Sequence, residues 1–299
     1  MKIISREQIE KLNISPLHCC EWIEKALQAK DEVLLPAKVA LKPDIEGVFY
    51  NTMPVIIPSR NNAGLKLVTR YPNRKPSLDS QILLYDLLTG EHLAFMDGNW
   101  ITAMRTGASA AHSIKLLAIE GFSLIGMVGL GSTAKATIKV LLALYPNRKL
   151  TVKLMKYKDQ HETFAGEFAG HDNVKFIYCD THKEIVSGSD VIISAVTMFE
   201  KDICIDGDFK EGVLLVPIHS RGFANCDLFF DKIYTDDTNH IKGFKFFNKF
   251  KKLAEISDVL KGNKLGREND RERILVYNIG IALHDIYFAG EIYKLLETE

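Results

Sequence analysis

The chain has 299 residues, of which 46% are hydrophobic and 25% charged, enough to bury the core of one large domain or two ordinary ones. Lys plus Arg and Asp plus Glu number 38 each, so no global field attracts nucleic acid or an anionic membrane. The odd set of five cysteines shows no CxxC spacing, which argues against a disulfide framework and against a bound metal: Cys19, Cys20, Cys179, Cys204 and Cys226.

The N-terminal third is predicted to form an α+β unit. Its first residues, MKIISREQIEKLN, are too polar for a secretory signal, and no apolar run approaches the roughly 20 residues that span a bilayer, so we expect a cytoplasmic protein. Residues 7–13 and 18–29 have helical patterns. Residues 48–57, 63–71 and 80–88 alternate like strands and are bounded by Pro, Asn and Gly.

A run of small residues, 107–111, follows Arg105 and would let a helix approach a ligand or another helix closely. Thr102 is a candidate N-cap of that helix. Arg105 would then lie in the first turn, which is unfavourable for a cation unless an anion is near. This local conflict points to function.

From about Phe122, short apolar runs alternate with amphipathic helical stretches as far as residue 236. This pattern is typical of a parallel sheet covered on both faces, and it predicts a Rossmann-type doubly wound domain. The last stretch, 279–297, has the spacing of an apolar helix, with Ile281, Asp285, Phe288 and Ile292 on one stripe. We therefore expect residues 119–275 to form the doubly wound domain and residues 1–118 with 276–299 to form the α+β domain.

Residues 129–134 read GxGxxA between an apolar strand and a helix, a pattern that suits a dinucleotide pyrophosphate. Gly129 and Gly131 would allow a sharp turn and close approach of backbone amides, while Ser132 and Thr133 would add hydroxyl donors. A tight turn with a purely structural role is the alternative.

The second strand of this domain ends in Lys156, Tyr157 and Lys158, where a site for NAD would carry an acidic residue. Two cations suit a 2′-phosphate, so we predict a preference for NADP(H) over NAD(H). The alternative is a solvated basic loop.

In motif order, the chain resembles the ornithine cyclodeaminase and mu-crystallin family. The resemblance rests on GLKLV with YPN, LLTGEHLAFMDG, MRTGASAA, VGLG, YTDD, GREND and GIALHD, spread over most of the sequence. It implies that the first domain carries the substrate site and a dimer interface, and that the second binds NAD(P). The family's activities move hydride between a nicotinamide and a carbon that bears nitrogen.

The resemblance also assigns individual residues. Lys38, Lys66 and Arg105 occupy positions whose cations hold a substrate carboxylate in relatives, and Lys66 is a candidate to polarise or protonate an imine. Taken singly, each is by default a surface cation. Further cofactor contacts are expected from Arg105 and Thr106. The fold places the segment after the fourth strand at the ligand edge of the sheet: Ser194, Ala195, Val196 and Thr197. Asn278 matches a family position near the nicotinamide amide.

The chain departs from the family at residues 219–228, HSRGFANCDL, where relatives carry an Asp that handles the substrate amine. Arg221 stands there, and a guanidinium does not act as a base near neutral pH. Either Arg221 binds a second carboxylate while His219 relays a proton, or both are ordinary loop residues and the protein is a nonenzymatic NADPH or ligand binder.

The sequence thus predicts an NAD(P)H-dependent oxidoreductase that reduces the imine of an amino acid and a keto acid, or a cyclic ketimine, as a homodimer. Ornithine cyclodeamination with recycled NAD is the alternative enzymatic interpretation.

Overall fold

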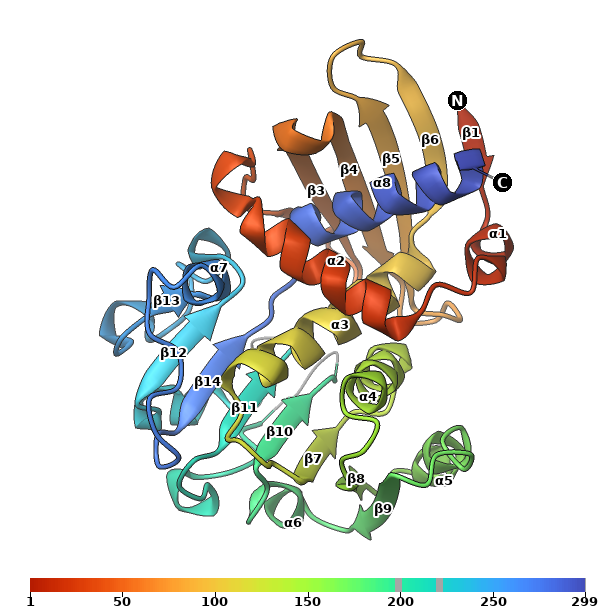
Figure 1. Ribbon diagram of the computed structural model, residues 1–299. Helices are drawn as coiled ribbons and strands as arrows, with labels where there is room; N and C mark the ends of the chain where they lie inside the picture. Colours follow the sequence, from red (N-terminus) through yellow and green to blue (C-terminus); the bar gives the residue numbers. More distant parts are fainter. Residues whose placement is uncertain (197–200, 219–222, 299) are drawn as a thin grey trace. The chain divides into compact units, whose positions relative to one another are not determined.

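The computed structural model describes residues 1–196, 201–218 and 223–298, and it divides into two compact units (Figure 1). Unit 1 comprises Met1–Arg105 and Gly280–Glu299, and unit 2 comprises Thr106–Ile279. The first boundary falls inside helix α3 (Asn99–Leu117), and the second lies just before helix α8 (Ala282–Thr298). The chain therefore returns to its first unit at its end.

Unit 1 is built on a six-stranded sheet in the described part of the chain, with the order β1-β6-β5-β4-β3-β2. All neighbours are antiparallel except the parallel pair of β1 and β6. The strands are β1 (Lys2–Ile4), β2 (Val39–Leu41), β3 (Phe49–Ile57), β4 (Asn62–Arg70), β5 (Leu78–Asp86) and β6 (His92–Asp97). The three strands expected from alternation correspond to β3, β4 and β5.

One face of this sheet is covered by α8, and α2 (Pro16–Gln28) lies beside α8 (Figure 1). The two helices meet where the rings of Trp22 and Phe288 pack edge to face with centroids 5.0 Å apart. A shorter helix, α1 (Arg6–Lys11), starts with a capping box at Ser5. Lys2 pairs with Glu297, so the two ends of the chain lie together.

Unit 2 is built on an eight-stranded sheet in the described residues, with the order β13-β12-β14-β11-β10-β7-β8-β9 and every pair parallel. The strands are β7 (Leu124–Val128), β8 (Leu150–Met155), β9 (Val174–Cys179), β10 (Val191–Ser194), β11 (Leu214–Pro217), β12 (Lys232–Thr235), β13 (Ala254–Glu255) and β14 (Ile274–Tyr277). The strand order reverses at β7, which is flanked by β8 and β10. This is the predicted doubly wound fold, and it is confirmed.

The helices of unit 2 are the rest of α3 together with α4 (Ser132–Leu144), α5 (Gln160–Gly166), α6 (His182–Val186) and α7 (Ile256–Leu260). Helices α3 and α4 touch closely, because a Cβ atom added at Gly107 would lie 2.5 Å from that of Ala136. The small residues after Arg105 therefore permit helix packing, as expected.

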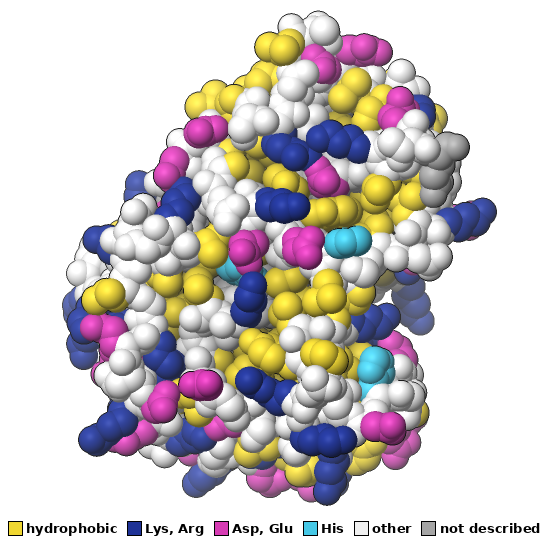
Figure 2. Space-filling view, viewed as in Figure 1, with side chains coloured by type: hydrophobic (Ala, Val, Ile, Leu, Met, Phe, Trp, Pro, Cys, Tyr) yellow, Lys and Arg dark blue, Asp and Glu magenta, His cyan; other side chains and the backbone are white. Residues whose placement is uncertain are grey.

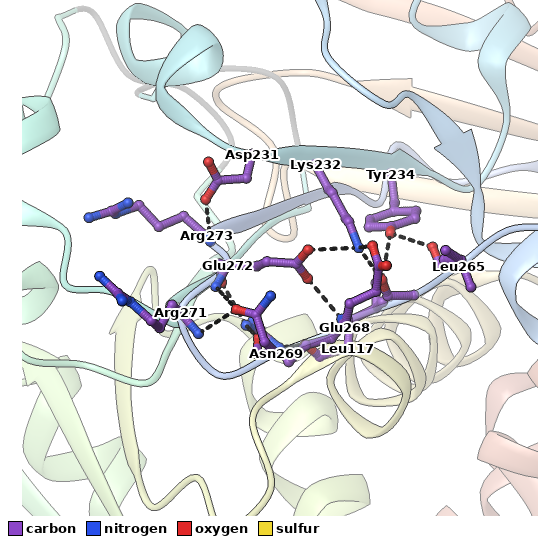
Figure 3. A network of polar contacts seen from close by, with 12 residues as sticks. Leu117, Asp231, Lys232, Tyr234, Leu265, Glu268, Asn269, Arg271, Glu272 and Arg273 are labelled. Carbon is purple, nitrogen blue, oxygen red and sulfur yellow. Dashed lines mark hydrogen bonds and ion pairs between the residues drawn. The ribbon is translucent and has the colours of Figure 1, made fainter.

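The GREND segment, residues 266–270, forms a polar network at the amino ends of β12 and β14 (Figure 3). The ammonium of the buried Lys232 contacts Glu268 and lies 2.9 Å from Glu272. Arg267 donates to the carbonyl of Leu117 at 2.7 Å and to that of Gly212 at 3.0 Å. Since ligands of doubly wound folds bind at the opposite, carboxyl edge, this network lies away from the expected ligand site.

The prediction that Thr102 caps α3 is wrong. The helix begins at Asn99, whose backbone N–H donates to Oδ1 of Asp97 at 2.9 Å, so Thr102 is already inside it. Arg105 consequently lies in the second turn. The unfavourable effect of the helix dipole on a cation, which was expected for the first turn, is weak there. Among the described residues, none of the helices is long and apolar enough to cross a membrane.

Candidate functional site

Lys66 is the central residue of a buried ionic cluster in unit 1. It lies on β4 between Met53 of β3 and Ile82 of β5, and its side chain is 0% exposed. Its ammonium donates to Oδ1 of Asp285 on α8 at 2.6 Å. Strand β4 thus directs the ammonium into the layer between the sheet and α8.

Arg105 shares the same acceptor. Its Nε donates to Oδ1 of Asp285 at 2.9 Å, and the arginine is only 6% exposed. The second oxygen, Oδ2, is buried and makes no hydrogen bond within the described ranges. One carboxylate therefore faces two buried cations, which leaves the cluster with an excess of positive charge when Lys66 is protonated.

The environment lowers the pKa of Lys66 from 10.5 to about 7. Burial is the main cause, and the charge of Arg105 adds to it, whereas Asp285 opposes the shift. The charge of the half-buried Lys38, next to β2, lowers the pKa further. The structure thus brings Lys66 and Arg105 together, and the charge of Lys38 acts on Lys66.

Gly280 makes room for the guanidinium of Arg105. Its φ is +83°, and an added Cβ atom would lie 2.5 Å from Nη1 of Arg105. A side chain at this position would be strained and would displace Arg105.

Sequence reasoning missed Asp285 as a site residue, because helical spacing placed it on the apolar stripe of the last helix. A carboxylate on such a stripe is rarely buried without a partner, and this was the available signal.

In unit 2, the loop between β7 and α4 has the conformation that the GxGxxA pattern predicts. Gly129 has a φ of +84°, and an added Cβ atom would lie 2.7 Å from the carbonyl of Ala195, after β10. At Gly131, an added Cβ atom would meet no atom of the described residues within 4 Å. Gly131 is also the N-cap residue of the 13-residue helix α4 and makes no side-chain capping bond.

The other predicted residues of this region lie around the same edge of the sheet. Ser132 and Thr133 form the first turn of α4, and Ser132 is exposed. Ser194 is buried at the end of β10, and Ala195 and Val196 follow it half-buried. Open space at Gly131, together with free amide groups at a helix N-terminus, suits a pyrophosphate.

Lys156 and Lys158 follow β8. The ammonium of Lys156 lies 2.9 Å from Asp180, just after β9, and this contact raises its pKa. Lys158 has a φ of +48° and holds its ammonium 5.4 Å from the ring centroid of Tyr157. Lys156 is therefore paired with a carboxylate that the sequence analysis did not consider.

Asn278 follows β14 and is 2% exposed. Its Oδ1 accepts hydrogen bonds from Ser109 and Ser113 of α3 at 2.9 and 3.3 Å. Thr106, also predicted to contact a cofactor, is buried in α3. The predicted residues Thr197, His219 and Arg221 lie outside the described residues.

The fold and these features define a two-unit α/β protein with a Rossmann-type sheet and a buried cationic cluster. The family model of the ornithine cyclodeaminase/mu-crystallin family matches residues 1–299. The chain belongs to this family, as its motifs indicated.

The chain aligns with most of the length of the curated relatives that it matches. It is 24% identical to the nodulation efficiency protein NfeD of Rhizobium meliloti, over 98% of this chain and 95% of that protein. It is 26% identical to the Δ1-pyrroline-2-carboxylate reductase of Bacillus thuringiensis subsp. konkukian, over 81% and 80%. It is 27% identical to the ketimine reductase mu-crystallin of Macropus fuliginosus, over 91% and 90%.

Solved structures have the same fold. The Δ1-pyrroline-2-carboxylate reductase of Thermococcus litoralis, in complex with NADH and L-proline, superposes with a TM-score of 0.89 at 25% identity and covers 100% of this chain and 98% of its own. An archaeal alanine dehydrogenase dimer with bound NAD gives a TM-score of 0.86 at 23% identity, over 99% and 96%.

Proposed function

We propose that this protein is an NAD(P)H-dependent oxidoreductase that reduces the C=N bond of an imine bearing a carboxylate. The observation that carries the proposal is the buried cluster of Lys66 and Arg105, which share one Asp285 oxygen. A buried excess of positive charge is costly, and a substrate carboxylate would neutralise it. The relatives named Δ1-pyrroline-2-carboxylate reductase and ketimine reductase support this class of substrate.

Unit 2 is proposed to hold the cofactor. The turn at Gly129, the open space at Gly131 and the N-terminus of α4 fit a pyrophosphate, and the NADH of the Thermococcus litoralis relative supports a nicotinamide dinucleotide. A bound nicotinamide supplies the hydride for the imine carbon.

Lys66 is proposed to bind the substrate carboxylate or to protonate the imine nitrogen. With a pKa of about 7, its amine gains and loses a proton near neutral pH. A substrate carboxylate beside it would raise that pKa and keep the proton on Lys66 in the complex. Arg105 and Lys38 would hold the carboxylate through charge-assisted hydrogen bonds.

His219 and Arg221 remain predictions from the sequence. We propose that Arg221 binds a second carboxylate and that His219 relays a proton, which would favour an imine formed from an amino acid and a keto acid. An Arg221→Ala variant that binds dicarboxylate substrates as the wild type does would remove this role.

The decisive experiment is to incubate the protein with NADPH, a mixture of keto acids and a mixture of amines, and to read the product masses. We expect consumption of NADPH with a product that joins one amine to one keto acid, or a reduced cyclic imine. Ammonia release without net oxidation of the cofactor would indicate a cyclodeaminase instead. Bound NADPH without any turnover would indicate a ligand-binding protein.

The role of Lys66 is tested by Lys66→Met. We expect kcat to fall by about 100-fold or more while the affinity for NADPH, measured by titration, stays unchanged. In the wild type, kcat/KM should fall as pH rises above about 7, because only the protonated amine acts as an acid. Intact turnover in the variant would remove Lys66 from the mechanism.

A preference for NADP(H) over NAD(H) is proposed from Lys156 and Lys158, whose cations suit a 2′-phosphate. Lys156 would exchange its exposed pairing with Asp180 for the phosphate. Replacing both lysines by Ala should weaken NADPH binding and leave NADH binding unchanged, with Lys149→Ala as the control on the same unit. Equal or tighter binding of NADH by the wild type would refute the preference.

We also propose a homodimer formed through the sheet face of unit 1 that lies opposite α8. This face carries a shallow apolar cavity of about 410 Å³, lined among others by Pro54, Ile56, Ala63, Leu65 and Tyr85. A second copy of the chain would cover these half-buried apolar side chains. Leu65→Arg should produce monomers in sedimentation experiments, whereas a wild-type monomer at micromolar concentration would exclude the dimer. On the face drawn in Figure 2, basic, acidic and hydrophobic side chains are interspersed.

A further inference from the structure

The side chain of Asn278 is held at the carboxyl end of β14 by bonds from two directions. Its backbone N–H donates to the carbonyl of Pro217, at the end of β11, at 3.0 Å. Its Oδ1 accepts from Ser109 and Ser113, which are four residues apart and therefore lie on one face of α3. Both serines are buried, at 5% and 1% exposure. The Oδ1 atom of Asn278 thus faces the two serines of α3.

In this orientation, the amide nitrogen of Asn278 has no acceptor among the described residues. Two hydroxyl groups occupy Oδ1, and Nδ2 is buried with no hydrogen-bond partner in the described part of the chain. A buried N–H group without an acceptor is unfavourable and rare in native structures. Such a donor is explained if a ligand brings the acceptor.

The position of Asn278 in the sheet indicates which part of a dinucleotide would reach it. The phosphate loop follows β7, where the strand order reverses, and Lys156 follows β8 on one side of that point. Strand β14 lies on the other side, next to β11. A dinucleotide lies across the switch point, so the half opposite the Lys156 side carries the nicotinamide.

We propose that Ser109 and Ser113 are positioning residues that orient Asn278 so that its Nδ2 donates to the carbonyl oxygen of the nicotinamide carboxamide. The structure supplies the unpartnered donor atom Nδ2 and the two serines that hold Oδ1. The inference rests on the proposed binding of a dinucleotide to unit 2. The opposite orientation would make Oδ1 an acceptor for the carboxamide NH2 group.

Two oxidised cofactor analogues distinguish these orientations in the wild-type protein. The 3-acetylpyridine analogue of NADP keeps the carbonyl oxygen and lacks the NH2 group, whereas the thionicotinamide analogue keeps the NH2 group and replaces the oxygen by a weakly accepting sulfur. Equilibrium titration should give similar dissociation constants for NADP and the acetylpyridine analogue, and one about three- to tenfold higher for the thio analogue. The reverse order of affinities would overturn the proposal.

The serines are tested by Ser109→Ala combined with Ser113→Ala. The amide of Asn278 could then rotate. The ratio of the dissociation constant of the thio analogue to that of the acetylpyridine analogue should therefore fall towards one. Binding of 2′-phospho-ADP-ribose, which lacks the nicotinamide, should stay unchanged, and this readout separates loss of orientation from misfolding. Ser189→Ala is the matched control, since Ser189 is buried in unit 2 and donates to the carbonyl of Ile185 at 2.6 Å.

A double variant that keeps the wild-type ratio would overturn the role of the serines. If neither NADP nor NAD binds the wild type, the proposed dinucleotide fails together with this inference. If NADP binds and its thio analogue binds equally well, only the inference fails.

Discussion

Lys66 and Asp285 are 219 residues apart in the sequence, and the ammonium of one lies 2.6 Å from the carboxylate of the other, with both side chains fully buried. This bond joins the middle of the six-stranded sheet to the C-terminal helix. Arg105 adds a second bond to the same oxygen. Breaking a buried pair by removing one partner costs far more than the net contribution of the pair, because a buried charge is left uncompensated.

The variant Asp285→Asn should therefore be strongly destabilised. It leaves the buried guanidinium of Arg105, and Lys66 whenever it is protonated, without their anion, and we expect the free energy of unfolding to fall by about 3–5 kcal/mol. Urea denaturation at neutral pH measures the change, with the exposed Asp172→Asn as the control, which should differ from the wild type by less than about 0.5 kcal/mol. A loss below about 1 kcal/mol for Asp285→Asn would mean that Arg105 does not depend on Asp285 as a buried counterion.

The lowered pKa of Lys66 predicts a pH dependence of stability. The pKa is about 7 in the folded chain and 10.5 as its ordinary value, so the unfolded chain binds more protons between these limits. The cost of protonating the buried amine is fully present below pH 7 and is relieved as pH rises towards 10.5. The wild type should gain stability relative to Lys66→Met between pH 7 and about pH 9, as measured by urea unfolding. A difference that does not change with pH would contradict the lowered pKa.

Much of the fold follows from the sequence because continuous apolar runs and their spacing leave few alternatives. The parallel order of unit 2 requires strands buried on both faces, and runs such as 190–196 could satisfy little else. The start of α3 was harder to predict. Asp97 accepts a hydrogen bond from the N–H group of Asn99, so the helix begins one turn before Thr102. A capping preference alone does not choose between two such candidates.

The sequence predicted those site residues that a motif identifies. It did not predict residues whose role depends on a side-chain partner that is distant in the sequence. Lys66 and Arg105 were found through motif order, but their shared carboxylate comes from the far end of the chain. Helical periodicity places Asp285 on the apolar stripe of the last helix and does not show its partners. The structure shows that it is the buried counterion of Lys66 and Arg105. The pairing of Lys156 with Asp180 depends likewise on the register of β8 and β9.

A second buried carboxylate predicts a pH dependence of the opposite sign. Burial raises the pKa of Asp227 from 3.8 to about 6, although the hydroxyl of Tyr277 donates to it and opposes the shift. The folded chain then binds more protons between these values, so this group makes stability fall as pH rises from 3.8 to 6. Asp227→Asn keeps an oxygen acceptor for Tyr277 and removes the charge.

Urea unfolding of both proteins should therefore show Asp227→Asn gaining stability over the wild type between about pH 4 and pH 6.5 and keeping the gain above that. Tyr277→Phe serves as the comparison, because it removes the donor and should enlarge the pH-dependent loss. Parallel curves for wild type and Asp227→Asn would show that this carboxyl has an ordinary pKa.

Gly280→Ala should disturb the site through contact with Arg105 as well as through backbone strain. Gly280 has a φ of +83°, and the added Cβ atom would lie 2.5 Å from Nη1 of Arg105. Gly90 offers a matched control, since its φ is +73° and its added Cβ atom would meet nothing within 4 Å. Gly90→Ala should lose only the roughly 1–2 kcal/mol of a left-handed conformation, and Gly280→Ala clearly more. Equal losses in urea unfolding would mean that Arg105 yields without cost and that Gly280 does not position it.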